Sequence, residues 1–316
     1  MTSETSREPQ DLQIIAEGLS FPEGPVAMAD GSVLVVEIPK GRLTLIAPDG
    51  STELYAEPGG GPNGAALGPD GEILLCNNGG SFGWVELDGL TVPDTQCPDT
   101  WQGGSIQRID PESREVRTLY TECDGHQLRG PNDLVLDAEG GIWFTDHGIR
   151  SGRTSDLTGI YWAAPDGSGI TEVAFPMESP NGIGLSPDGS HLYVAETNTG
   201  RVWAWEIIGS GQLGEGDPFS AHHGLLLAGL SRHRLLDSLA VDGEGWVCVG
   251  TLLEGGITSI SPDGSEIETT PFEDPLVTNI CFGPADPDRA FVTLSGTGKV
   301  ASMPWHRPGL VPNFNS

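Results

Sequence analysis

Six polar residues stand at equivalent positions of a phrase that returns six times along the chain. Each phrase has a polar residue, a hydrophobic segment, a glycine-containing turn, a second hydrophobic segment and another polar residue 14 or 15 positions after the first. Carboxylates and carboxamides are hard oxygen donors, which suit Ca²⁺ or a similar divalent ion better than a thiolate-bound metal does. Residues of these types also cap turns locally, but six equivalent positions favour a shared metal site. The first polar residues are Glu23, Asn63, Asn132, Asn181, Asp237 and Asn279.

The second polar residues of the six phrases form another equivalent set. They could support the first set, contact a substrate or simply end a strand in solvent. The histidine in FTDHG, His147, follows one of them and is a candidate general base, since an ordinary imidazole titrates near neutral pH; a loop or supporting role is favoured for it. The set consists of Glu37, Asn77, Asp146, Glu196, Thr251 and Thr293.

The elements that position these residues are short strands. After each phrase come a glycine and a third strand, and in five copies a turn then leads towards an outer strand. Six four-stranded antiparallel repeats predict an all-β, six-bladed β-propeller occupying residues 1–316 as one domain. The sixth repeat lacks its outer strand, and residues 12–16 would supply it and close the ring. The first ten or so residues are expected to lack order.

In such a blade, the first polar residue begins the inner strand and the second ends the neighbouring antiparallel strand. Both sets therefore lie at one mouth of the central channel. The segment Asn78–Gly103 follows the second strand of blade two and carries Phe82, Trp84 and Trp101. A loop of this length in a compact domain is typical of a lid or binding loop.

Composition narrows the function. The net charge is −30 and only two lysines occur, which argues against nucleic-acid binding. No apolar run has the length of a membrane span or a signal peptide, and the five cysteines show no CxxC spacing. We expect a cytoplasmic protein that does not associate with membranes; its oligomeric state is open. The sequence has no GxSxG, HExxH or P-loop motif, and GSGQLG from Gly209 is interpreted as a hairpin turn.

The chain resembles the senescence marker protein/gluconolactonase (regucalcin-like) family of six-bladed propellers. The resemblance runs from FPEGP at position 21 to FVTLSG at position 291. Its most specific parts are GPNDLVLDAEGGIWFTD, SPNGIGLSPDGSHLYVAETNTGRVWAW and LLDSLAVDGEGWVCVG. Members look like metal-dependent lactone hydrolases, and relatives on the same fold hydrolyse phosphotriesters.

The resemblance implies specific roles. The family's metal ligands correspond to Glu23, Asn181 and Asp237, and its substrate-contacting asparagine corresponds to Asn132. Asn63, in a second P-N-G turn, is an additional candidate ligand or substrate contact. Two departures from the family pattern, Asp237-Ser238-Leu239 and Thr145-Asp146-His147-Gly148, affect the expected substrate more than the metal.

The leading hypothesis is a hydrolase that opens a sugar-acid or similar small lactone with one divalent ion. Ca²⁺ is the preferred ion, with Zn²⁺, Mn²⁺, Mg²⁺ and Fe²⁺ as alternatives. Asp237 would be both a ligand and the base or nucleophile, while Asn132, Asn63, Asp146 and His147 would contact the substrate. The alternatives are a phosphotriesterase-like hydrolase using the same ion and a non-catalytic propeller that binds Ca²⁺ or a metabolite.

Overall fold

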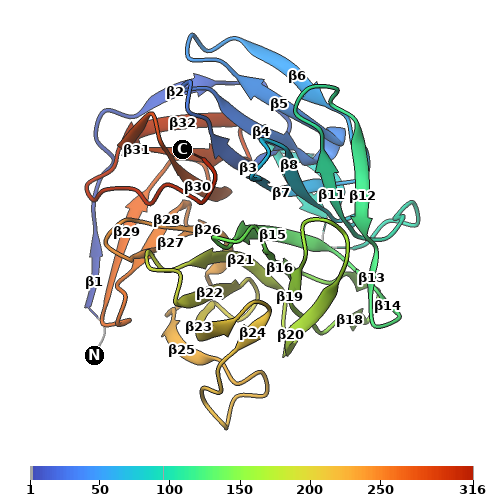
Figure 1. The fold of residues 1–316 in the computed structure, drawn as a ribbon. Helices are drawn as coiled ribbons and strands as arrows, with labels where there is room; N and C mark the ends of the chain where they lie inside the picture. The colour runs from blue at the N-terminus through green and yellow to red at the C-terminus, as the bar shows by residue number, and fades with distance from the viewer. Residues whose placement is uncertain (1–2, 95, 316) are drawn as a thin grey trace.

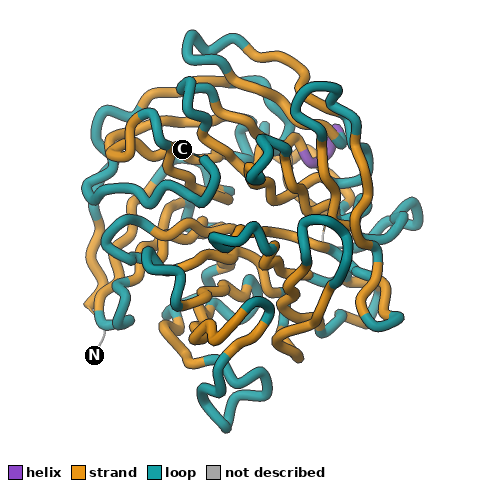
Figure 2. Tube along the Cα trace, viewed as in Figure 1, coloured by secondary structure: helices purple, strands orange, loops and turns teal. Residues whose placement is uncertain are grey.

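The computed structural model describes residues 3–94 and 96–315, which fold into a ring of six antiparallel β-sheets (Figure 1). Strands and loops make up nearly all of this part of the chain, with one short 3₁₀ helix, η1 (Ile38–Lys40) (Figure 2). The fold is a six-bladed β-propeller, as the repeats predict. None of the described residues forms a helix long and apolar enough to cross a membrane.

Each of the first three blades is a four-stranded meander that runs outward from the channel. Blade one contains β3 (Pro22–Ala27), β4 (Val33–Glu37), β5 (Arg42–Ile46) and β6 (Thr52–Ala56). Blade two contains β7 (Pro62–Leu67), β8 (Ile73–Asn77), β11 (Ser105–Ile109) and β12 (Val116–Tyr120). Blade three contains β15 (Pro131–Leu136), β16 (Ile142–Asp146), β19 (Thr158–Ala163) and β20 (Ile170–Met177).

The last three blades repeat this order. Blade four contains β21 (Pro180–Leu185), β22 (His191–Glu196), β23 (Arg201–Gly209) and β25 (Leu225–Gly229), with β24 (Gln212–Leu213) paired to the far end of β23. Blade five contains β26 (Leu235–Val241), β27 (Val247–Leu252), β28 (Gly256–Ile260) and β29 (Glu266–Pro271). Blade six contains β30 (Val277–Gly283), β31 (Asp286–Leu294) and β32 (Lys299–Pro304).

The N-terminal part of the chain closes the ring. Strand β2 (Gln13–Ala16) pairs antiparallel with β32, where Ile14 lies opposite Ala301. Ala16 is buried in a hydrophobic cluster with Val33, Val35, Ile46 and Val300. The predicted completion of blade six is confirmed, and it removes the open edge that β32 would otherwise present.

The expectation that about ten N-terminal residues lack order is wrong for part of this segment. Residues 3–6 form β1 (Ser3–Ser6), a fifth strand that pairs in parallel with β29 on the outside of blade five. Met1 and Thr2 lie outside the described residues. All four side chains of β1 are exposed. The strand is held by its backbone pairing and by contacts of Glu4 with Arg234 and Ser231, and it leaves no hydrophobic pattern in the sequence.

Three small hairpins extend the loops at one end of the ring. They are β9 (Gly83–Leu87) with β10 (Leu90–Asp94), β13 (Glu122–Cys123) with β14 (His126–Gln127), and β17 (Arg150–Ser151) with β18 (Thr154–Ser155). The first belongs to the long segment of blade two and the third to the loop of blade three. Both decorate the end of the blades that carries the polar residues.

The inner strands share an irregularity that shapes the channel. In β7, β15, β21 and β26, the pairing with the second strand shifts by one residue near the first polar position, as in a β-bulge. A bulge inserts a residue and turns neighbouring side chains out of strict alternation. Adjacent residues at this level can therefore both face the channel axis.

Candidate active site at one mouth of the channel

The structure gathers the first set of polar residues around the channel, one on each inner strand. They are Glu23 on β3, Asn63 on β7, Asn132 on β15, Asn181 on β21, Asp237 on β26 and Asn279 on β30. Five of the six are buried and Asp237 is half-buried. Neighbouring inner strands contact one another all the way around, so the predicted convergence is confirmed as an arrangement of the backbone.

Small residues next to the polar positions allow this convergence. A Cβ atom on Gly64 would lie 2.7 Å from both Cα and Oδ1 of Asp133, and one on Gly182 would lie 2.7 Å from the carbonyl oxygen of Asp237. Both distances are far inside van der Waals contact. Glycine is needed here because the backbones of consecutive blades touch.

One further residue of this group, Asp133, is not among the residues that the repeated phrase predicts. The residue after the polar position is glycine in blades one, two and four and serine in blade five, but it is an aspartate in blade three. Asp133 is buried, and its Oδ1 accepts a hydrogen bond of 2.9 Å from the Leu134 N–H. Burial, reinforced by the charge of Glu23, raises the pKa of Asp133 to about 8.

Asp133, Glu23 and Asp237 form a cluster of mutually repelling carboxyl groups. Burial raises the pKa of Glu23, although hydrogen bonds from Asn279 and the Gly24 N–H oppose the rise. Burial also raises the pKa of Asp237 well above its usual range, and the charges of Glu23 and Asp133 add to the rise. Among the described residues, no ion pair joins any of the three to a lysine, arginine or histidine.

Two amides of the set hold fixed orientations. Asn181 Nδ2 donates to Thr197 Oγ1 at 3.0 Å, and Ser238 Oγ donates to Asn181 Oδ1 at 3.4 Å. Asn279 Nδ2 donates to Glu23 Oε2 at 2.8 Å, while its Oδ1 accepts from the Ile280 N–H at 2.8 Å. Asn279 therefore positions Glu23 and has its own oxygen already engaged.

Two oxygen atoms at this level have no donor. Glu23 Oε1 and Asn132 Oδ1 are buried without a hydrogen-bond partner in the described part of the chain. A buried oxygen without a partner is costly, and so are several buried carboxylates without a cation. Both features fit residues that bind a divalent cation.

The donor set also restricts the kind of metal. No three His, Cys, Asp or Glu side chains among the described residues lie close enough together to hold an ion by themselves. A metal at this mouth would need amide oxygens beside its carboxylates. Ca²⁺ and Mg²⁺ accept such ligands readily.

The second set of polar residues has a different environment. Glu37 Oε2 accepts from the Ser20 N–H at 2.8 Å, Asn77 Oδ1 from the Gly61 N–H at 2.9 Å, and Glu196 Oε1 from the Glu178 N–H at 2.9 Å. Each residue thus caps the segment that leads into the inner strand of its own blade. The two threonines, Thr251 and Thr293, bond to the hydroxyls of Thr258 and Thr278.

Asp146 follows the same rule, which argues against its expected contact with a substrate. Its carboxylate accepts hydrogen bonds from the backbone N–H groups of Arg129 at 2.6 Å, Gly130 at 2.7 Å and Gly148 at 2.9 Å. With three donors and almost no exposure, these oxygens are committed to a turn of blade three.

The long segment of blade two reaches across the same end of the ring. The Thr91 N–H donates to the Gly296 carbonyl of blade six at 2.9 Å, and the Cys97 N–H donates to the Arg150 carbonyl of blade three at 2.8 Å. Trp84 packs on Phe21, with 4.8 Å between ring centroids. The segment is thus an anchored cover that spans from blade six to blade three.

His147 lies next to this cover. Its ring centroid is 6.1 Å from that of Phe82, in an edge-on arrangement. Burial lowers the pKa of His147 to about 4, so the imidazole is neutral at pH 7. The aromatic ring of Phe82 and the uncharged imidazole of His147 lie side by side under this cover.

Comparison with known proteins identifies the family. Residues 21–296 match the SMP-30/gluconolactonase/LRE-like region, and the chain belongs to this family. It is 26% identical over 309 residues to a gluconolactonase of Zymomonas mobilis, covering 86% of this chain and 76% of the relative. It is also 26% identical over 258 residues to the lactonase drp35 of Staphylococcus saprophyticus, covering 81% and 71%.

Solved structures share the fold. A gluconolactonase from Xanthomonas campestris superposes with a TM-score of 0.73 at 22% identity, covering 93% of this chain and 89% of the other. The calcium-binding protein regucalcin from Agrobacterium tumefaciens gives a TM-score of 0.73 at 16% identity, with both chains fully covered. Membership of a family with lactonases supports a lactone-hydrolysing propeller.

Proposed function

We propose that this protein is a metal-dependent hydrolase that opens a small lactone at the mouth formed by the first set of polar residues. The observation that carries the proposal is the cluster of the buried Glu23 and Asp133 with the half-buried Asp237, none of which has a cationic partner among the described residues. Two nearby oxygens, Glu23 Oε1 and Asn132 Oδ1, lack donors as well. The names of the relatives from Zymomonas and Staphylococcus supply the reaction class.

Glu23, Asn181 and Asp237 are the proposed metal ligands, with Asn132 and Asp133 beside them. A bound divalent ion would polarise the lactone carbonyl and stabilise the negative charge that develops on its oxygen. Thr197 and Ser238 hold the Asn181 amide with its oxygen turned away from Thr197. Asn279 holds one oxygen of Glu23 and leaves the other free.

Asp237 is the proposed catalytic residue. As a base, one of its carboxylate oxygens would take a proton from the water that attacks the carbonyl carbon. As a nucleophile, the same oxygen would attack that carbon and form an acyl-enzyme that water then hydrolyses. In both routes the ring C–O bond breaks, and the departing alkoxide receives a proton to give the hydroxy acid.

Asp237 suits this role because it is the half-buried member of an otherwise buried set, so it is the carboxylate that solvent and substrate can reach. Asn63 and Asn132 on the adjoining strands are proposed to contact the substrate. Phe82 and His147 would cover its less polar face. These residues exclude bulk water from one side of the lactone.

The test combines elemental analysis of the purified protein with a panel of sugar and aliphatic lactones, assayed before and after chelation. We expect one divalent ion per chain, lactonase activity that chelation abolishes, and recovery when the ion is restored. A phosphotriester in the same panel distinguishes lactonase activity from phosphotriesterase activity. A metal-free protein with full lactonase activity would overturn the proposal. A metal-loaded protein with no hydrolase activity would also overturn it and would indicate a non-catalytic, metal-binding propeller.

A further inference from the structure

A cavity lies inside the propeller, on the opposite side of the cluster of Glu23, Asp133 and Asp237 from the loop cover. Its volume is about 750 Å³, within the range of cavities that hold small ligands. One end is formed by Gly24, Asp133 and Asn279, and the other by residues 310–313 and the turn after β21. The cavity therefore extends from the level of the carboxyls to the opposite mouth of the channel.

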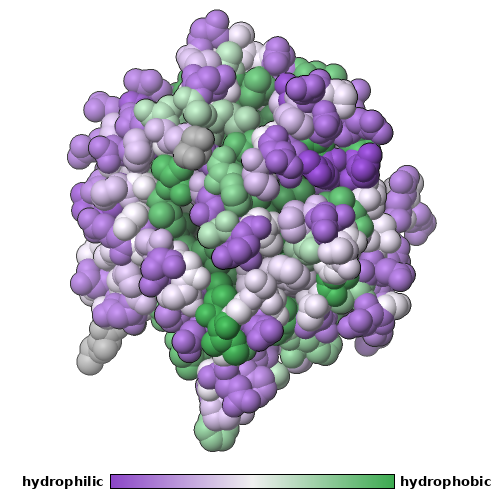
Figure 3. Space-filling view, viewed as in Figure 1, coloured by the Kyte–Doolittle hydropathy of each residue, from purple (hydrophilic) through white to green (hydrophobic). Residues whose placement is uncertain are grey.

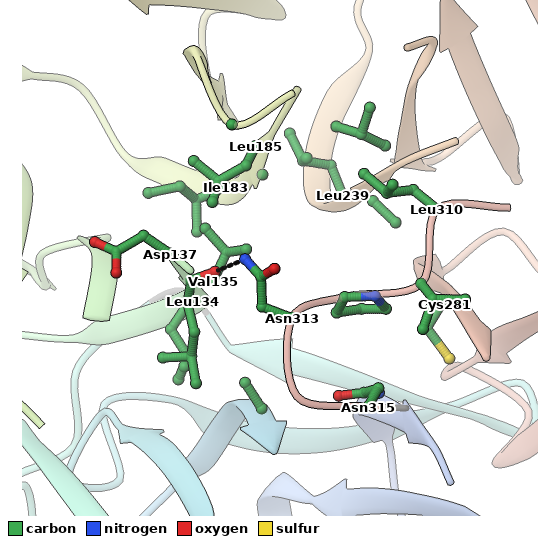
Figure 4. A pocket seen from close by; sticks show the side chains of 18 of the residues that line it. Leu134, Val135, Asp137, Ile183, Leu185, Leu239, Cys281, Leu310, Asn313 and Asn315 are labelled. Carbon is green, nitrogen blue, oxygen red and sulfur yellow. Dashed lines mark hydrogen bonds between the residues drawn. The ribbon is translucent and has the colours of Figure 1, made fainter. Parts of the chain in front are cut away.

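The wall of this cavity is largely aliphatic. Figure 4 shows Leu134, Ile183, Leu185 and Leu239 around it, with Cys281 on the opposite side. On the corresponding face, Figure 3 shows hydrophobic residues across the middle of a surface that is mostly hydrophilic at its margins. A wall of this kind favours an apolar ligand, because it removes hydrocarbon from water.

The charges of the lining residues restrict the ligand to uncharged molecules. The lining residues include the acids Asp133, Asp137, Glu139 and Asp188, and none of them is a lysine, arginine or histidine. A carboxylate or phosphate placed here would lose its hydration without gaining a cationic partner. Acidic groups near both ends therefore disfavour anions and leave neutral molecules as suitable ligands.

The C-terminal strap, residues 308–315, lies across the outer end of the cavity. It begins at a firm anchor, since the Gly243 N–H donates to the Pro308 carbonyl at 2.6 Å and the Gly309 N–H donates to the Pro287 carbonyl at 2.7 Å. Arg307, immediately before it, is buried and forms an ion pair with the fully buried Asp242.

Beyond this anchor the strap is attached through two asparagine side chains and through the packing of Leu310 and Phe314 against hydrophobic clusters. Asn313 Nδ2 donates to the Leu136 carbonyl at 2.9 Å, and Asn315 Nδ2 donates to the Ala27 carbonyl at 3.1 Å. Figure 4 draws the first of these bonds as a dashed line from Asn313. Between the two attachment regions, Leu310 and Val311 line the cavity from the outside.

We propose that this cavity binds a small neutral molecule with an aliphatic chain, and that the C-terminal strap is the lid through which the molecule enters. The aliphatic walls receive the chain, and the acidic groups near both ends can accept a hydrogen bond from a hydroxyl. The cavity meets the proposed lactone site at Asp133 and Asn279, but its aliphatic wall and the strap contain none of the proposed metal ligands. The proposed binding of a neutral ligand does not depend on hydrolysis by Glu23, Asp133 and Asp237.

The experiment uses 1-octanol and octanoate, which share a chain length and differ in charge. Isothermal titration calorimetry of the full-length protein should show saturable binding of one octanol per chain. Octanoate should bind at least about tenfold more weakly, because its charge would lose hydration without gaining a cationic partner in the cavity. Absence of saturable octanol binding, or equal binding of octanoate, would overturn the proposal.

Variants locate the binding. Val311→Trp should fill the cavity from the strap and abolish octanol binding, whereas Val85→Trp, on the exposed hairpin of the loop cover, should leave it unchanged. Cys281→Phe fills the cavity from the opposite wall and serves if Val311→Trp fails to fold. Octanol binding that persists in a folded filling variant would place the ligand elsewhere.

The lid is tested by Asn313→Ala, which removes the hydrogen bond to Leu136. Stopped-flow measurements should show octanol association and dissociation both accelerated by about threefold or more, with Kd changed less than either rate. Unchanged rates would mean that the ligand enters without movement of the strap.

Discussion

The two sets of polar residues at the channel mouth occupy equivalent places in the six blades but have opposite surroundings. In the second set, Glu37, Asn77, Asp146 and Glu196 each receive backbone N–H groups from the segment that enters their own blade. In the first set, carboxyls and amides face one another, and Glu23 and Asn132 each keep an oxygen without a donor. The supply of donors therefore separates residues that hold the fold from residues available for chemistry.

The largest effect on activity is expected for Asp237→Asn, which tests whether the first set of polar residues carries out the chemistry. The substitution keeps the shape and an oxygen donor but removes the charge that accepts a proton or attacks the carbonyl. We expect kcat at saturating metal to fall by about 10²–10⁴. Asp146→Asn is the matched control from the second set, and it should retain kcat per folded molecule. Equal loss in both variants would remove the distinction between the sets.

Glu23→Gln should weaken the binding of the ion while preserving the fold. The change removes one charge from a site that depends on few carboxylates, and the amide can still contact Asn279. We expect the dissociation constant of Ca²⁺, measured by calorimetry on chelated protein, to rise by at least about tenfold. Wild-type affinity in this variant would show that Glu23 is not a ligand.

Glu37→Gln tests whether the second set of polar residues stabilises the fold. Burial favours protonation of Glu37, but hydrogen bonds from Lys40, Thr44, the Ser20 N–H and Arg42 outweigh it and hold its pKa below the ordinary 4.5. We expect the variant to lose about 1–3 kcal/mol of unfolding free energy at pH 7, with unchanged metal affinity.

The stabilisation by Glu37 should depend on pH in a defined direction. A carboxylate with a depressed pKa stabilises the fold above its unfolded-state pKa, and that contribution disappears as the pH falls through the folded-state value. Urea unfolding of wild type and Glu37→Gln should therefore differ most near neutral pH and converge below about pH 4. A gap that widens on acidification would contradict the assignment.

Much of this arrangement follows from the sequence. The repeated phrase predicts the blades, the closing strand and the six polar positions around one mouth, because strand alternation and blade order determine them. It does not reveal which oxygens receive donors, since those hydrogen bonds come from turns without a distinctive pattern. The exception is Asp133, whose signal was present: it replaces the glycine that follows the corresponding asparagine in blades two and four.

Asp133 also shows why counting along a strand can fail. In an ideal strand, neighbouring side chains point to opposite faces, so Asn132 and Asp133 would not share a site. The bulge between Pro131 and Leu134 relaxes that rule. Strand β1 was missed for a different reason, since its side chains are all exposed and polar and leave no hydrophobic pattern.

Shortening the β9–β10 hairpin should have a moderate effect on substrate binding. The hairpin anchors the loop cover on blade six through Thr91, and it touches none of the proposed metal ligands through a hydrogen bond in the described structure. We expect replacement of residues 85–92 by a short turn to raise KM for the preferred lactone by about three- to tenfold. Metal content should stay at one ion per chain, and loss of the ion would make the cover part of the metal site.

The smallest effect is expected for His147→Ala, which decides between two candidate bases. His147 lies beside Phe82, and burial lowers its pKa to about 4, so its basicity is poorly matched to catalysis near pH 7. Its contribution in our scheme is apolar cover. We expect kcat to change by less than about threefold and KM to rise modestly, measured beside Asp237→Asn at saturating metal. If His147→Ala abolishes turnover while Asp237→Asn retains most of it, the histidine is the base. The catalytic group would then lie on the loop after β16 and not in the first set of polar residues.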